Sequence, residues 1–294
     1  MRKEYSLFAL LIATSFCMAC GPQITTSQEP GRQVSFQGHK IYYEVHGQGG
    51  STLVFIHGWT GSTETWKYQL DAFPQHRVIV VDLPGNGRSS RRVEDVYSME
   101  FFADAVHHVL EVEEIGQAFF FGHSMGFAVV EVIAARYPQR CCGIGSIDGA
   151  HFEVPADEMG QQAWLLEMEH FADMMTEEKG REEFINMLFL PDTPALLKEE
   201  VMKVSRTVPL HIGRAMIKGV ADNMNYWLPR KVELPCLAVY SPAYGLPPGY
   251  SEVFARDFPL VEYHEVEGVS HFFMLEIPYR LNQIITDFVD AHDG

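Results

Sequence analysis

With 294 residues, the chain is long enough for one large domain with a sizeable core. Its 47% hydrophobic and 21% charged residues are typical of a globular protein. The formal net charge of −17 argues against nucleic-acid binding, because phosphates need a basic surface, and it disfavours strongly anionic substrates.

The first twenty residues differ in character from the rest. Arg2 and Lys3 precede a mostly apolar stretch, residues 7–16, that is too short to span a bilayer as a stable anchor. Ala19 and Cys20 follow, and the composition of residues 21–32 is typical of a flexible tether. Residues 1–20 resemble a bacterial lipoprotein signal, which implies lipidation at Cys20, export to the bacterial cell envelope and a lipid anchor in a membrane. An ordinary cleaved secretory signal is the alternative.

Three cysteines lie beyond the signal segment: Cys141, Cys142 and Cys236. An odd number in an exported protein leaves at least one thiol unpaired or joined to another chain. Cys142 and Cys236 begin two predicted strands, so a disulfide between them is one interpretation. Small buried apolar residues are the other.

From residue 33 onward, strands alternate with helices. Residues 33–36 and 40–46 predict an antiparallel pair, and later apolar runs predict strands covered on both faces. This alternation predicts an α/β fold with a mostly parallel, doubly wound sheet. The further predicted strands cover residues 52–56, 77–81, 119–121, 143–147, 236–240 and 261–266. The predicted helices cover residues 64–73, 98–113, 127–137 and 273–289, and residues 247–258 are predicted as a loop and helix.

Residues 152–226 interrupt the alternation with a helical stretch that contains no convincing strand. We therefore expect residues 33–151 and 227–294 to form the core and residues 152–226 to form an inserted helical cap. A helical subdomain without a gating role is the alternative.

Four polar residues fall at the carboxyl ends of predicted strands: His57, Asp82, Ser124 and Asp148. In open α/β sheets, ligands bind at this edge. The pattern predicts a functional site there.

Ser124 lies in Gly122-His123-Ser124-Met125-Gly126, between a predicted strand and a predicted helix. This context is that of a nucleophile elbow, a sharp turn that holds the serine in a strained conformation. A Cβ at either glycine would crowd the neighbouring strand or helix. A serine hydroxyl needs a base within hydrogen-bond reach, and among 13 histidines His271 follows the last predicted strand on a short turn.

With these motifs the chain resembles the α/β-hydrolase superfamily, in its serine-nucleophile, capped, esterase- or lipase-like branch. The resemblance implies Ser124 as nucleophile and His271 as general base and then acid. It implies an oxyanion hole from the backbone N–H groups of Trp59 and Met125, each worth about 3 kcal/mol in the transition state. No cofactor and no metal are expected. The matching motifs are His57-Gly58-Trp59, Asp82-x-x-Gly85-x-Gly87-x-Ser89, the Ser124 pentapeptide and Gly268-Val269-Ser270-His271, while His57, Asp82 and His123 are interpreted as structural.

One departure concerns the acid that orients the base. Most of the superfamily places it after the seventh strand, where this chain has no Asp or Glu until Glu252. Some lipases place it after the sixth strand, where this chain has Asp148, so Asp148 is predicted as the acid. A catalytic dyad, or help from Glu267, is the alternative.

The predicted reaction is acyl transfer from a small-molecule carboxylic ester to water. A serine in the elbow argues against the aspartate-nucleophile branches of the superfamily. Carbon–carbon bond hydrolase, lactonase and small peptidase are alternatives, as is an inactive fold used as a surface-tethered binding protein; no protein partner is predicted. Trp59, His123 and Trp164 are the candidate substrate-binding residues, and Trp164, Phe171, Met174 and Met175 suggest an apolar substrate group.

Overall fold

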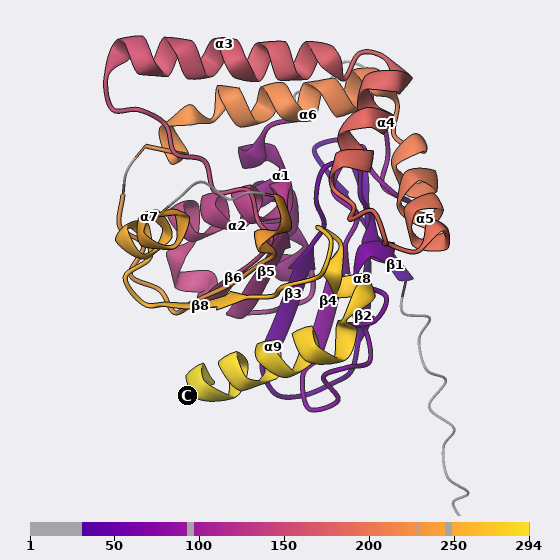
Figure 1. Cartoon of the computed structure of the whole chain (residues 1–294). Coiled ribbons are helices and arrows are strands. Elements are labelled where there is room, and N and C mark those ends of the chain that lie inside the picture. The colour runs from indigo at the N-terminus through magenta and orange to yellow at the C-terminus, as the bar shows by residue number, and fades with distance from the viewer. Residues whose placement is uncertain (1–30, 93–96, 229, 245–248, 294) are drawn as a thin grey trace, which may run out of the picture.

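The computed structural model describes residues 31–92, 97–228, 230–244 and 249–293 (Figure 1). The predicted signal and lipidation site, residues 1–20 with Cys20, lie outside the described residues, as does most of the predicted tether. Gly31 and Arg32 were expected in the tether and instead begin the first strand. Arg32 is held there because its guanidinium donates to the Glu113 carboxylate at 2.5 and 2.7 Å.

The described residues form an eight-stranded sheet in the order β1-β2-β4-β3-β5-β6-β7-β8. β1 pairs antiparallel with β2 and β2 with β4, while the remaining pairs are parallel. The predicted mostly parallel sheet is therefore confirmed. The strands are β1 (Gly31–Phe36), β2 (His39–His46), β3 (Thr52–Ile56), β4 (Arg77–Val81), β5 (Ala118–His123), β6 (Cys141–Ile147), β7 (Cys236–Tyr240) and β8 (Val261–Glu265).

Helices cover both faces of the sheet because the central strands are apolar on both sides. Val54 and Phe120 belong to one buried cluster, and their neighbours Phe55 and Phe121 belong to the other. The first face carries α1 (Met99–Val112), α2 (Met125–Arg136) and α7 (Tyr250–Asp257). The second carries α8 (Phe273–Glu276) and α9 (Pro278–His292). This is the doubly wound arrangement that the sequence predicts.

The prediction of a helix over residues 64–73 is wrong. The structure has only a short 3₁₀ helix, η1 (Thr63–Trp66), followed by turns. Hydrogen bonds from i+3 to i link Gln69 to Trp66 and Ala72 to Gln69, so the chain winds in successive tight turns. The Gln69 side chain is buried and donates to Asn282 Oδ1 at 2.8 Å on α9, which fixes this course against the core.

Four helices occupy the stretch between β6 and β7: α3 (Glu158–Met174), α4 (Glu178–Met187), α5 (Ala195–Arg206) and α6 (Leu210–Asp222). Figure 1 shows them gathered beyond one end of the sheet, at the top of the view. Pro194 and Pro209 directly precede α5 and α6, where the missing proline N–H costs nothing. We call these four helices the cap.

β6 and β7 are neighbours, but the three described cysteines are free thiols. The register pairs Cys236 with Ile144, two residues beyond Cys142, so the disulfide considered from the sequence does not form. Burial raises the pKa of the Cys141 thiol to about 12, which keeps it protonated and unreactive.

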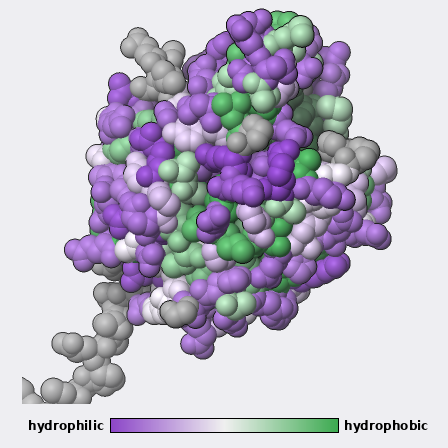
Figure 2. Space-filling view, turned by 90° about the vertical axis from the view of Figure 1, so that its left-hand side faces the viewer, coloured by the Kyte–Doolittle hydropathy of each residue, from purple (hydrophilic) through white to green (hydrophobic). Residues whose placement is uncertain are grey.

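The surface that lies on the left in Figure 1 is mainly hydrophilic, with hydrophobic residues gathered near its middle (Figure 2). Among the described residues, no helix combines the length and the apolar character that crossing a bilayer requires.

Candidate active site

Ser124 lies in the sharp turn between β5 and α2. Its backbone has φ 51° and ψ −127°, a strained conformation for a residue with a side chain. A Cβ added at Gly126 would lie 2.3 Å from the Ile56 carbonyl oxygen, and one at Gly122 would lie 2.4 Å from the Phe127 nitrogen. Only glycine fits at either position, as the sequence predicts, because the obstacles are backbone atoms of the next strand and helix.

Backbone hydrogen bonds hold the strained turn and tie it to the end of β6. The Ser124 carbonyl accepts from Phe127 and Ala150 N–H, both at 2.9 Å. Ser124 N–H in turn donates to Ile147 O at 3.3 Å. The turn that carries Ser124 and the turn that carries Asp148 are thus fixed to one another.

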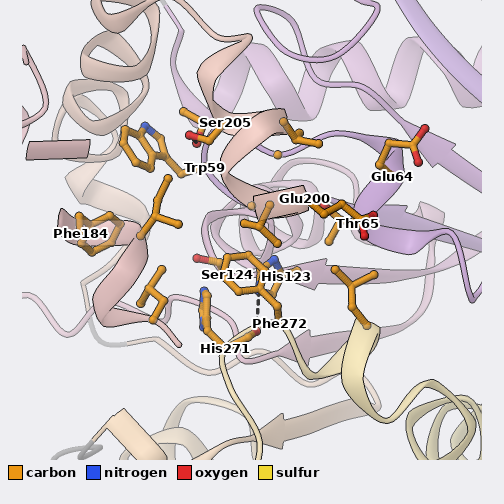
Figure 3. Close-up of a pocket in the computed structure, with 18 residues that line it drawn as sticks. Trp59, Glu64, Thr65, His123, Ser124, Phe184, Glu200, Ser205, His271 and Phe272 are labelled. Carbon is orange, nitrogen blue, oxygen red and sulfur yellow. Dashed lines mark hydrogen bonds between the residues drawn. The ribbon is translucent and has the colours of Figure 1, made fainter. Parts of the chain in front are cut away.

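His271 and Asp148 form a close buried pair. Nδ1 of His271 lies 2.6 Å from Oδ2 of Asp148, and because a carboxylate only accepts, the imidazole donates. This leaves Nε2 as the ring nitrogen that can take a proton. Ser124 and His271 line the same pocket, and Figure 3 shows their side chains next to each other.

The segment after β7 supports this carboxylate without supplying one. Ser241 N–H donates to the other Asp148 oxygen, Oδ1, at 2.8 Å. The Ser241 hydroxyl donates to Val269 O at 2.7 Å, on the turn that leads to His271. Glu252 and Glu267, the other carboxylates considered from the sequence, are both exposed.

Two backbone N–H groups of the described residues near Ser124 are candidates for an oxyanion hole. Within the described part of the chain, neither Trp59 N–H nor Met125 N–H donates to another protein group. Met125 is the first residue of α2, where backbone donors lack helical partners. Trp59 lies in a turn closed by Gly61 N–H on Gly58 O at 3.1 Å. Such donors could stabilise an oxyanion.

His57 and Asp82 are buried, and their side chains form hydrogen bonds with the backbone of neighbouring loops. Nε2 of His57 accepts from Leu83 N–H at 3.0 Å, so Nδ1 carries the proton and donates to Gly58 O at 2.8 Å. The Asp82 carboxylate accepts from Thr63 and Arg88 N–H, both at 2.7 Å. Neither side chain is among those that line the pocket.

His123 connects the turn that carries Ser124 to the turn that carries His271. Its Nε2 lies 3.0 Å from the backbone carbonyl oxygen of His271, so Nε2 carries a proton and donates. Burial, together with the nearby His271, lowers the pKa of His123 well below its ordinary value. The ring is therefore a neutral donor that anchors the His271 main chain (Figure 3).

The pocket above Ser124 encloses about 610 Å³ of open space, including its mouth. Figure 3 shows Phe184 on one side of Ser124, and Glu64 and Glu200 on the other. The wall between these ends is mostly apolar and is formed by the loop after β3, by cap helices α4 and α5 and by the segment after His271. Its apolar residues are Trp59, Phe184, Ile185, Leu188, Val201, Val204, Phe272 and Leu275.

Two of the three candidate substrate-binding residues, Trp59 and His123, line this pocket, and Trp164 does not. Trp164 packs edge-on against Phe152, with ring centroids 6.1 Å apart. Phe171, Met174 and Met175 also lie outside the pocket. Sequence reasoning missed the residues of α4 and α5, although the i, i+3 spacing of Val201 and Val204 marks an apolar helix face.

The cap is bonded to the loop that carries the Trp59 N–H. The Trp59 indole donates to Gly213 O of α6 at 2.8 Å. The hydroxyls of Thr60 and Ser205 lie 2.8 Å apart, which links the same loop to α5. Any movement of these helices would therefore act on the unpaired donor beside Ser124.

Comparisons with known proteins agree with the fold. Residues 51–186 match the family model described as alpha/beta hydrolase fold. Epoxide hydrolase B of Mycobacterium tuberculosis is 35% identical over 112 residues, which are 37% of this chain and 32% of that protein. The chain spans about a third of the length of the first curated relatives that it matches.

Two further matches extend over most of the chain. The pimeloyl-[acyl-carrier protein] methyl ester esterase of Yersinia enterocolitica is 25% identical over 261 residues, 85% of this chain and 97% of that protein. The solved structure of a thermophilic esterase from Thermogutta terrifontis superposes with a TM-score of 0.74 at 22% identity, covering 91% of this chain and all of that one.

Proposed function

We propose that the chain is a member of the α/β-hydrolase superfamily and, within it, a serine hydrolase that cleaves a carboxylic ester. In this proposal Ser124 is the nucleophile, His271 is the base and Asp148 is the acid that orients it. The observation that carries the proposal is the 2.6 Å contact between Asp148 and His271 on the rim of a pocket that contains a strained Ser124.

The reaction would run in two steps. As Ser124 Oγ attacks the ester carbonyl carbon, Nε2 of His271 takes its proton, and the imidazolium then passes this proton to the departing alcohol oxygen. Water attacks the resulting acyl-enzyme in the same way and releases the acid and the free serine. The negative charge on the carbonyl oxygen in both steps would be met by Trp59 and Met125 N–H.

The proposal of an ester as the substrate rests on the similarity to an esterase and on the chemistry of a serine nucleophile. The match to a methyl ester esterase over nearly its whole length supports it. The partial match to an epoxide hydrolase does not lead us to propose epoxide hydrolysis. Attack of Ser124 on an epoxide would give an ether, which water does not cleave. An acyl-serine, by contrast, is readily hydrolysed.

Covalent labelling tests this proposal directly. A fluorophosphonate probe should modify Ser124, and a peptide map should locate it there. The wild type should hydrolyse p-nitrophenyl esters, and Ser124→Ala should abolish both signals while keeping its melting temperature. A folded wild type that neither takes the label nor cleaves any ester across a range of acyl lengths would overturn the proposal and favour a binding protein.

A further inference from the structure

Phe184 stands between the active-site pocket and a second hollow in the cap. It lines the pocket that contains Ser124. It also lines an open groove, about 1040 Å³ including its mouth, between the end of α3 and α4. Among the described residues, Phe184 is the one that the linings of the two spaces have in common.

The ring is held in this dividing position by edge-to-face contacts on both sides. Its centroid lies 5.7 Å from that of Trp59, on the pocket side. It lies 5.0 Å from that of Phe171, which lines the groove. Phe184 also packs against two separate apolar clusters of the cap, one around Met175 and one around Ile185. The surrounding contacts thus fix the ring as a wall rather than leaving it free to swing.

The groove behind this wall suits an apolar chain. Met174 and Met187 line it and are 47% and 68% exposed, which is unusual for large apolar side chains. Met175 and Phe171 add buried and half-buried apolar surface. Polar side chains, among them Asp173, Lys179 and Glu183, line the rest of the groove, so its apolar surface is confined to Phe184 and the four residues just named.

We propose that Phe184 sets the maximum length of the apolar chain that the enzyme accepts, by closing the pocket off from the groove. The inference rests on the ester hydrolase function proposed above and names its specificity determinant. The apolar chain belongs either to the acyl group, which is bonded to the carbonyl carbon that Ser124 attacks, or to the alcohol, which is bonded to that carbon through the ester oxygen. In the wild type the chain stops at Phe184; without the ring it continues past Phe171 into the groove.

The test measures kcat/KM for two ester series in wild type, Phe184→Ala and Phe184→Leu. One series varies the acyl group, from p-nitrophenyl acetate to decanoate, and the other varies the alcohol, from ethyl to decyl acetate. Phe184→Ala should raise the ratio of octyl to butyl substrates at least tenfold in one series, and Phe184→Leu should give a smaller rise. The series that responds identifies the chain that points toward Phe184.

A second substitution checks that the longer chain enters the groove. Adding Met187→Trp to Phe184→Ala refills the groove and should reverse most of the gain for the longest substrates. Leu196→Ala, 86% exposed on α5 and away from both cavities, is the matched cap control and should keep the wild-type profile.

The possible outcomes separate this inference from the proposed function. If folded Phe184→Ala and Phe184→Leu keep the wild-type ratio within twofold in both series, Phe184 is not the length determinant, although the ester hydrolase assignment stands. A rise that Met187→Trp leaves untouched would place the chain elsewhere and overturn the groove as its site. If the wild type cleaves no ester in either series, the proposed function fails and this inference fails with it.

Discussion

Asp148 and His271 interact across the end of a strand that carries neither of them. Asp148 follows β6, His271 follows β8, and β7 lies between these strands in the sheet. Oδ2 and Nδ1 meet at 2.6 Å, and the first residue after β7, Ser241, donates its N–H to the second carboxylate oxygen. The segment after β7 therefore positions a carboxylate that follows an earlier strand.

Replacing Asp148 tests this arrangement. Asp148→Asn keeps the shape of the side chain but presents an uncharged group to Nδ1, so the imidazolium loses its stabilisation and the other tautomer is favoured. We expect kcat/KM for a p-nitrophenyl ester to fall roughly 10⁴-fold with little change in melting temperature. Glu267→Gln, an exposed carboxylate near His271 in sequence, should stay within twofold of the wild type. Near-normal activity of Asp148→Asn would mean that another group orients the base.

Much of this site could be predicted from sequence because its parts are set locally. A buried strand that ends in a glycine-flanked serine fixes the elbow, and position after a strand places Asp148 and His271 at one edge of the sheet. The sequence also shows that no Asp or Glu directly follows β7, and this absence indicates Asp148 as the carboxylate. These inferences need only the strand order and the shared edge.

The pocket walls could not be predicted, because they depend on how the cap docks. Trp164 is a large apolar residue on α3, but that helix packs against α6 and turns Trp164 toward Phe152. The apolar residues that face Ser124 come from α4 and α5, whose orientation has no local signature. The helix prediction for residues 64–73 is wrong for a related reason. The burial of Trp66 and Gln69 against the core outweighs the helical pattern of this segment.

His123 is expected to act through His271 rather than on the substrate. His123→Phe keeps a ring of similar size but removes the Nε2–H that donates to the His271 carbonyl. Losing one buried hydrogen bond costs about 1–2 kcal/mol, so kcat should fall roughly tenfold as the base becomes less well held. KM should change little. A rise in KM with unchanged kcat would instead assign His123 to substrate binding.

Gly126 is expected to be essential for folding of the elbow. In Gly126→Ala the new Cβ would meet the Ile56 carbonyl at 2.3 Å, and neither backbone can move without shifting β3 or α2. We expect a loss of about 1–3 kcal/mol in unfolding free energy and a lower melting temperature. Gly116→Ala is the control, because a Cβ there meets nothing within 4 Å. Equal stability of the two variants would contradict the steric account of the motif.

Lipidation at Cys20 is a proposal about residues outside the described structure. When the full-length chain is expressed in a bacterium, the mature protein should fractionate with membranes, begin at Cys20 and carry the mass of a lipid. Cys20→Ser should remove the added mass and release the protein from the membrane, whereas Cys17→Ser should change neither. Two acyl chains suffice for stable anchoring, so partial release by salt alone is not expected. An unmodified mature N-terminus in the wild type would favour an ordinary secretory signal.

His151, whose side chain is only 5% exposed, should make stability depend on pH. It lies between two carboxylates, 3.1 Å from Glu131 Oε1 and 3.2 Å from Asp257 Oδ2. Burial opposes its charge, but the Glu131 charge and the hydrogen bonds to both carboxylates outweigh burial and raise the pKa of His151 to about 9. Arg256 also bonds to Asp257, whose pKa is held near 2 by these partners against the opposing effect of burial.

The direction of the pH effect follows from the raised pKa of His151. Its ordinary pKa is about 6.5, so the stabilisation is complete below pH 6.5 and is lost as the pH rises through about 9. Urea unfolding between pH 6 and 9.5 should show a decline on the order of 3 kcal/mol in the wild type. His151→Gln should lose this decline, because the unfolded chain no longer differs from the folded one at this site. His264→Gln, exposed on β8, should keep the wild-type slope. A His151→Gln profile parallel to the wild type would show that the decline arises from other groups.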